Sequence, residues 1–149
     1  MKAVNPYLNF PGNTREAFDF YRSVFGGEFL AVLRFRDFGE NTMGIPDEEM
    51  DRIAHIALPL GPNNILMATD VVGNRQELKV GNNSYITIEA ESAEEADRLF
   101  QGLSAGGRVE MPLQQTQWAE KYGICIDRYG VQWMIDYTGN VRFGNGASA

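Results

Sequence analysis

The sequence predicts an α+β protein built from two similar βαβββ modules within one domain. Three observations support this fold class: an amphipathic helix pattern occurs twice, a β-rich segment precedes each copy, and further β-rich segments follow each copy. The second helix pattern begins at Ser92, 79 residues after the first begins at Asn13. One shift without gaps superposes the two helices, which is typical of an internal duplication.

Each predicted helix has a defined start, one apolar face and a glycine pair after its end. The first starts at Asn13 and the second at Ser92, where Ser92 and Glu95 have the spacing of a capping box. Gly26-Gly27 and Gly106-Gly107 follow the two helices, as is common at helix C-termini. The apolar positions at helical spacing are Ala17, Phe18, Tyr21, Val24 and Phe25 in the first helix and Ala96, Leu99, Phe100 and Leu103 in the second.

The predicted strands follow the same order in both modules. In the first module, residues 1–70, strands are expected at 4–10, directly after the first glycine pair, at 52–60 and at 64–69. In the second module, residues 84–138, strands are expected at 84–91, directly after the second glycine pair, at 123–127 and at 131–137. A short turn joins the last two strands of each module.

Three segments are predicted to lie outside these elements. Residues 37–51 are polar and acidic and contain Gly and Pro, which predicts a long surface loop of the kind that often covers a site. Its acidic run, Asp47-Glu48-Glu49, is expected to be solvated. Residues 71–83 are expected to link the modules, and residues 139–149 to form a flexible tail.

Charge and composition disfavour several partners. The chain has 149 residues, of which 13 are basic and 20 acidic, and its net charge of −7 repels nucleic acid and anionic membranes. It contains no apolar run of about 20 residues and starts without the apolar segment of a signal peptide, so we expect a cytoplasmic protein with no membrane partner. Cys125, the single cysteine, fits a reducing compartment and is expected to be a small buried apolar residue.

A set of short segments covers nearly the whole chain in a characteristic order. In the first module they are Pro6–Phe10, Gly12-Asn13, Phe20-Tyr21, Phe25–Glu28, His55 and Leu66–Asp70. In the second module they are Trp118-Ala119, Tyr122-Gly123, Asp127, Tyr129–Val131 and Trp133–Ile135. Together they resemble the PhnB-like branch of the vicinal-oxygen-chelate superfamily, which includes glyoxalases and bleomycin-resistance proteins.

This resemblance implies a curved, incompletely closed eight-stranded sheet around a ligand cleft, often shared across a homodimer. The superfamily includes lyases, ring-cleaving dioxygenases, epimerases and antibiotic-resistance proteins, so the fold alone does not select the function. Some PhnB-like proteins carry a ubiquinone-methyltransferase name, but this sequence has no glycine-rich nucleotide loop after a strand.

The resemblance also locates the metal positions of the superfamily. Metal-dependent members place one His or Glu on the first strand and one on the last strand of each half. In this chain the first-strand positions fall on Tyr85 and on Pro6, or on Asn5 if the turn after the first strand contains a bulge, and the last-strand positions fall on Met67 and Met134. None of these side chains is a usual ligand for Mg, Mn, Ni or Zn, so we expect no bound metal and no other cofactor.

His55 is the candidate catalytic residue. It is the only histidine, and alternation places it on the same strand face as Ala57. If this face lines the cleft, His55 can act as a general base or donate a hydrogen bond to a ligand. The alternative is a histidine that is hydrogen-bonded within the sheet or at a dimer interface. Asp70 could orient His55, although a strand-end Asp that begins a turn is the more common arrangement.

The candidate ligand contacts are polar, aromatic and thioether side chains from both modules. They are Tyr7, Asn9, Met67, Tyr85, Gln115, Trp118, Tyr122 and Met134. Tyr7 and Asn9 share one face of the first strand, where solvent exposure would also explain them. The group around Trp118 suits a small polar or aromatic ligand, although an aromatic cluster at a barrel or dimer seam would explain it equally well.

Two functions follow from these residues, and a third stays open. The first is a protein that binds or sequesters a small organic molecule, with His55 as one polar contact. The second is an isomerase or lyase that uses His55 as base, with Tyr or Gln side chains stabilising an enolate-like oxyanion. The sequence shows no second clear acid or base near His55. The third is an interaction module whose cleft is vestigial.

Overall fold

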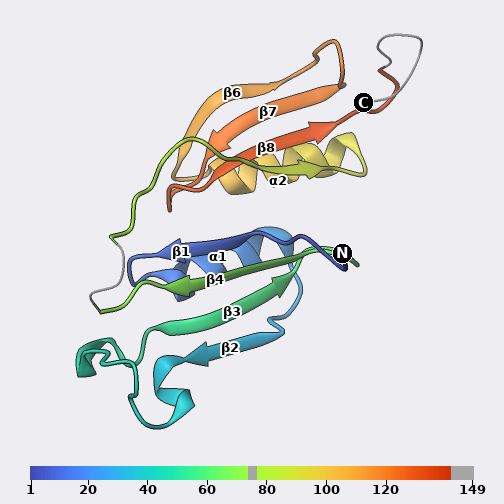
Figure 1. Ribbon diagram of the computed structural model, residues 1–149. Coiled ribbons are helices and arrows are strands. Elements are labelled where there is room, and N and C mark those ends of the chain that lie inside the picture. The colour runs from blue at the N-terminus through green and yellow to red at the C-terminus, as the bar shows by residue number, and fades with distance from the viewer. Residues whose placement is uncertain (74–76, 142–149) are drawn as a thin grey trace. The chain divides into compact units, whose positions relative to one another are not determined.

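The computed structural model describes residues 1–73 and 77–141, which form two compact units, Met1–Lys79 and Val80–Ala149. Each unit has the order strand, helix and three strands that the internal duplication predicts. In each unit one helix packs along one face of a four-stranded sheet (Figure 1). Most of the predicted flexible tail, residues 142–149, lies outside the described residues.

The first unit contains a mixed sheet with the strand order β1-β4-β3-β2. Its elements are β1 (Tyr7–Phe10), α1 (Thr14–Phe25), β2 (Ala31–Arg34), β3 (Ile53–Pro59) and β4 (Ile65–Asp70), with the short 3-10 helices η1 (Phe35–Phe38) and η2 (Asp47–Glu49) between β2 and β3. β1 pairs with β4 in parallel, and the other pairs are antiparallel.

The second unit has the equivalent strand order β5-β8-β7-β6. Its elements are β5 (Ile86–Glu89), α2 (Ala93–Ser104), β6 (Arg108–Gln114), β7 (Lys121–Ile126) and β8 (Gln132–Tyr137). Here too the first and last strands pair in parallel, whereas β6 pairs with β7 and β7 with β8 in the antiparallel direction.

The helix predictions are confirmed, and both helices bury the faces that the apolar spacing indicates. The buried helix residues include Ala17, Phe18, Tyr21 and Val24 in α1 and Ala96, Leu99, Phe100 and Leu103 in α2. They pack against alternate strand residues such as Leu66 and Ala68 of β4 and Trp133 and Ile135 of β8, all completely buried. Each sheet therefore has one face covered by its helix and one helix-free face.

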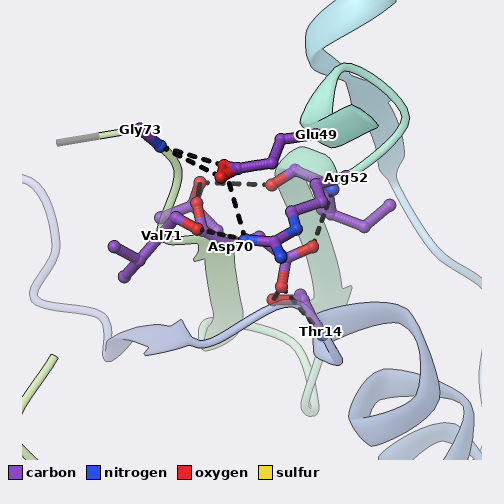
Figure 2. A network of polar contacts seen from close by, with 8 residues as sticks. Thr14, Glu49, Arg52, Asp70, Val71 and Gly73 are labelled. Carbon is purple, nitrogen blue, oxygen red and sulfur yellow. Dashed lines mark hydrogen bonds and ion pairs between the residues drawn. The ribbon is translucent and has the colours of Figure 1, made fainter. Parts of the chain in front are cut away.

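The two helices begin in different ways. Ser92 Oγ accepts a hydrogen bond from Glu95 N at 3.0 Å, as the capping box predicts, and Glu95 Oε1 accepts one from Glu91 N at 3.0 Å. Asn13 makes no side-chain cap on α1. The backbone N–H of Thr14 instead donates to Asp70 Oδ1 at 3.0 Å, so a carboxylate from β4 caps this helix (Figure 2).

Asp70 ends β4, as predicted, but its buried side chain has a structural role and does not orient His55. Its Oδ1 also accepts from Thr14 Oγ1 at 2.6 Å, and its Oδ2 accepts from Ile53 N at 2.8 Å. The side chain is 2% exposed and points to the helix-covered face, whereas alternation puts His55 on the helix-free face. Asp70 thus joins α1, β3 and β4 and orients no imidazole.

The predicted surface loop is anchored more firmly than its composition suggests. Phe35, Ile45, Met50 and Val72 form a small buried cluster, against which Ala54 of β3 packs. This cluster forms because the few apolar residues of the polar loop fold inward onto the start of β3.

Glu49 is the second anchor, so the expectation of a fully solvated acidic run is wrong for this residue. Its carboxylate accepts a hydrogen bond from Gly73 N at 3.0 Å and lies 3.7 Å from Arg52 Nη1. Arg52 Nη1 in turn donates to Val71 O at 3.0 Å. Figure 2 shows these contacts joining the end of the loop to the chain that leaves β4.

Candidate functional site

The helix-free face of the first unit collects most of the candidate residues of that module. Tyr7 pairs with Met67 and Asn9 with Thr69 in the parallel β1–β4 ladder, and Leu33 pairs with His55 across β2 and β3. Asn9 is exposed and makes no side-chain hydrogen bond within the described part of the chain.

Tyr7 and His55 form the most specific contact on this face. The Tyr7 hydroxyl lies 3.1 Å from His55 Nδ1, and the two rings stack with centroids 5.8 Å apart and planes 26° apart. This is the hydrogen bond within the sheet that the structural alternative for His55 predicts. Among residues 1–73 and 77–141, Nε2 has no such partner, so that nitrogen is available to a ligand.

The direction of this hydrogen bond determines what His55 can do. If the Tyr7 hydroxyl donates to Nδ1, then Nε2 carries the proton and is a hydrogen-bond donor. If Nδ1–H donates to the phenol oxygen, Nε2 is an acceptor and a candidate base. The tautomer of the imidazole and the direction of its hydrogen bond with Tyr7 are therefore linked.

The helix-free face of the second unit centres on Met134. Thr87 and Ile124 are its neighbours in the ladder, and Met134 Sδ lies 3.6 Å from Thr87 Oγ1 and 3.4 Å from the Tyr122 hydroxyl. Trp118 packs edge-on against Tyr122, with ring centroids 5.2 Å apart and an interplanar angle of 77°. Because Trp118 remains 41% exposed, its ring offers a flat apolar surface.

Tyr85 borders this centre, whereas Gln115 makes no contact with it within the described residues. Tyr85, directly before β5, donates its hydroxyl hydrogen to Glu110 Oε2 at 3.4 Å. Burial raises the pKa of the Tyr85 phenol, and the Glu110 carboxylate raises it further. Gln115 is exposed just after β6, and in the described part of the chain its amide bonds to neither Trp118 nor Tyr122. The structure thus groups Trp118, Tyr122 and Met134 but leaves Gln115 apart.

The sequence reasoning missed a pair of carboxyl groups on the same face. Glu89 and Asp136 are direct partners in the parallel β5–β8 ladder, and Thr138 Oγ1 donates to Glu89 Oε1 at 3.0 Å. Burial, followed by the contact with Glu89, raises the pKa of Asp136 to about 7. Alternation was the available signal, because Glu89 follows Thr87, and Asp136 follows Met134, by two residues.

The ladder registers settle the alignment of the two halves. Tyr7 and Thr87, the partners of Met67 and Met134, are 80 residues apart, whereas the helices are 79 apart. The additional residue lies in the turn after β1, so Asn5, rather than Pro6, corresponds to Tyr85. Asn5 Oδ1 accepts a hydrogen bond from Ile65 N at 3.0 Å and thereby holds the start of β4.

Within residues 1–73 and 77–141, no group of three or more His, Cys, Asp or Glu side chains is arranged to hold a metal ion. Cys125 is completely buried, as predicted, and burial raises the pKa of its thiol to about 11. No helix in the described part of the chain is both long and apolar enough to cross a membrane.

Two βαβββ units, each with a parallel pairing of first and last strands, define a protein of the vicinal-oxygen-chelate fold. The fosfomycin resistance protein FosX from Listeria monocytogenes has this fold, with a TM-score of 0.62 at 10% identity over 89% of this chain and 90% of that chain. The model of the 3-demethylubiquinone-9 3-methyltransferase family matches residues 2–136, and the chain belongs to this PhnB-like family. The predicted superfamily and branch are therefore confirmed.

Relatives at higher identity agree with this assignment. Protein YjdN from Escherichia coli (strain K12) is 31% identical over 147 residues, which cover 89% of this chain and 93% of that protein. The crystal structure of protein PA1353 from Pseudomonas aeruginosa has a TM-score of 0.80 at 38% identity, covering 91% and 96% of the two chains. A putative 3-demethylubiquinone-9 3-methyltransferase, the PhnB protein from Bacillus cereus, has a TM-score of 0.65 at 29% identity, covering 90% and 98%.

Proposed function

We propose that this protein binds a small organic ligand on the helix-free faces of its sheets and does so without the divalent metal of its superfamily. The observation that carries the proposal is the Trp118–Tyr122 pair beside Met134, because it leaves an aromatic ring exposed next to a helix-free face. Ligand sites of this kind combine apolar walls with a few polar groups, which Thr87 and Tyr85 supply here.

The metal-free character of the proposed site follows from its central residues. The positions that hold ligands in metal-dependent members carry Asn5, Met67, Tyr85 and Met134. The Asn5 oxygen is engaged by β4, and two hydroxyl groups lie against the Met134 sulfur. Thioethers are poor ligands for the hard or borderline divalent ions.

The methyl transfer named in the family description does not fit these residues. Nucleotide-type cofactors commonly bind at a glycine-rich turn between a strand and a helix. In this chain the corresponding connections are Pro11-Gly12-Asn13 after β1 and Ala90-Glu91-Ser92 after β5. The two connections together contain a single glycine, Gly12. These connections therefore do not support the binding of a nucleotide-type methyl donor.

A second candidate function is an isomerase or lyase in which His55 is the base. The observation that favours it is the 3.1 Å contact between Tyr7 and His55 Nδ1, which orients the imidazole on an accessible face. In the tautomer with Nδ1 protonated, Nε2 can accept a proton from a substrate carbon. Turnover of a dicarbonyl, catechol or thiol adduct that disappears in His55→Ala would establish this function.

The proposal also covers the oligomeric state of the protein and its cellular compartment. We propose a cytoplasmic homodimer, because related proteins commonly pair their modules across two chains and because the one cysteine is a buried thiol. Light scattering coupled to size-exclusion chromatography measures the mass of the assembly, and a monomer of 16.7 kDa would overturn the dimer.

Tryptophan fluorescence tests the main proposal, because Trp133 is completely buried and Trp118 is not. Compounds from a library of small aromatic and polar molecules are added, and hits are defined by quenching together with thermal stabilisation. We expect Trp118→Ala to weaken binding of the hits about five- to tenfold, the value of an aromatic contact. Phe38→Ala is the matched control, since Phe38 is an exposed aromatic residue in η1. Equal losses in both variants, or no hit, would contradict the proposal.

A further inference from the structure

The Glu89–Asp136 pair is the least explained polar feature of the second unit. The two residues face each other in the β5–β8 ladder, and Asp136 pairs with Tyr122 of β7 on its other side. Tyr122 in turn contacts Trp118, so the carboxyl pair borders the proposed ligand surface. The ion pairs found in the described part of this unit join other residues: Arg98 with Glu95, Arg108 with Glu110 and Lys121 with Asp97.

The geometry indicates that this pair carries a proton. Asp136 Oδ1 is shielded from solvent and has no hydrogen-bond donor within the described part of the chain. A shielded carboxylate oxygen beside a second carboxylate is unfavourable, and a proton on one of the two groups removes both the repulsion and the unmade hydrogen bond. The raised pKa of Asp136, about 7, agrees with this geometry.

Among residues 80–141, the other ionisable groups do not supply an alternative partner. On the helix-free face, Glu110 of β6 binds Tyr85 and lies 3.5 Å from Arg108. Lys121 of β7 belongs to the opposite face, where its ammonium binds Asp97 of α2 at 2.6 Å. Tyr122 directs its hydroxyl at Met134 Sδ. The charge that acts on Asp136 is that of Glu89.

Glu120 is the remaining acidic group near the end of β8. Its Oε2 accepts a hydrogen bond from Asn140 N at 2.7 Å, and its own backbone N–H donates to Thr138 O at 3.2 Å. Glu120 is therefore bound to the segment that follows β8 and not to Glu89 or Asp136.

We propose that the Glu89–Asp136 pair binds one proton at neutral pH, which lies between the two carboxyl groups in the free protein, and that one carboxyl group donates this O–H hydrogen to a carbonyl or hydroxyl oxygen when a ligand binds. This inference rests on the proposed ligand binding and gives it a chemical class. The ring of the ligand packs against Trp118 and Tyr122, and its oxygen accepts the hydrogen bond from the carboxyl pair. Because the pair retains one negative charge, neutral ligands bind in preference to carboxylates.

The shared proton is tested first, on the full chain, by carbon-13 NMR of labelled Asp and Glu carboxyl groups during a pH titration. We expect one carboxyl step near pH 7. Asp136→Asn should remove this step, since the amide can donate a hydrogen bond to Glu89 but does not titrate. Glu94→Gln, at an exposed position on α2, should leave the step unchanged. A wild-type protein whose carboxyl groups all titrate below about pH 5 would overturn the shared proton.

The donor role is tested with benzamide and benzoate, which have the same ring and differ in charge. Backbone amide shifts of Thr87, Tyr122 and Asp136 report binding at this face. Benzamide affinity should fall severalfold between about pH 6 and about pH 8.5, as the donor is lost, and should become independent of pH in Asp136→Asn. At about pH 6, benzoate should bind about tenfold more weakly than benzamide, because it meets the remaining charge.

Either of two results would overturn the donor role: benzamide affinity that does not change with pH, or benzoate binding as tightly as benzamide. Library compounds that still bind in a Trp118-dependent way would, in those cases, leave the proposed function standing. Absence of any Trp118-dependent ligand would instead contradict the proposed function itself.

Discussion

Replacing Asp70 by Asn should destabilise the first unit strongly, although the change removes only a charge. The Asp70 carboxylate accepts from Thr14 N and Thr14 Oγ1 at one oxygen and from Ile53 N at the other. An amide has one acceptor oxygen, so its NH₂ group must face a donor on one side. At least one charged hydrogen bond is lost, at about 1.5–3 kcal/mol, and a buried donor is left unmade at about 1–3 kcal/mol.

The expected loss is therefore about 3 kcal/mol in the free energy of unfolding, or a fall of about 6–12 °C in Tm for a chain of this length. Urea denaturation followed by circular dichroism measures this value, and amide hydrogen exchange should show faster opening at Thr14 and Ile53. Asp19→Asn is the control, because Asp19 forms only an exposed pair with Arg15, and should cost less than about 0.5 kcal/mol. A loss below about 1 kcal/mol for Asp70→Asn would refute the reasoning.

Three further perturbations test other parts of the structure. The free energy of unfolding should fall by about 1–2 kcal/mol as pH rises from about 4 to about 7. The pKa of Asp136 is raised in the folded state, so the folded protein keeps a proton in this range that the unfolded chain has released. Solvent screening makes the change smaller than the full pKa difference would give. Asp136→Asn should flatten this slope in urea titrations, and an unchanged slope would contradict the assignment. Tyr7→Phe should shift the His55 imidazole nitrogen-15 signals toward a different tautomer ratio, whereas identical spectra would show that the 3.1 Å contact has no influence. Gly123→Ala should cost about 1–3 kcal/mol, because an added Cβ would lie 2.8 Å from the Phe100 ring; a neutral effect would mean that α2 moves freely on its sheet.

The duplicated fold could be predicted because its signals are local. Helical spacing identified the buried faces of both helices. Alternation separated the face of Tyr7 from the helix-covered face of its strand, and it put His55 on one face with Ala57. The strand bounds were less accurate. The first strand begins at Tyr7 and not at residue 4, because Pro6 has no N–H for the ladder.

The site could be predicted only in part, because its remaining features depend on contacts between distant residues. Asp70 ends a strand, and nothing local indicates that its carboxylate caps a helix 56 residues earlier. Glu89 and Asp136 become partners through the parallel β5–β8 register, which brings together residues 47 positions apart. Glu49 was predicted to be solvated with its acidic neighbours, but its carboxylate contacts Gly73 N and Arg52 in the structure. In each case an acidic residue has a role that its neighbours in the sequence do not encode.

The central claim is ligand binding without the divalent metal of the superfamily, and metal content measured together with binding tests it most directly. Protein without a histidine tag is purified without chelator and analysed by inductively coupled plasma mass spectrometry, and the strongest ligand is titrated before and after treatment with chelator. We predict metal far below one ion per chain and unchanged ligand affinity. Close to one transition-metal ion per chain, with ligand binding lost when the metal is removed, would contradict the claim.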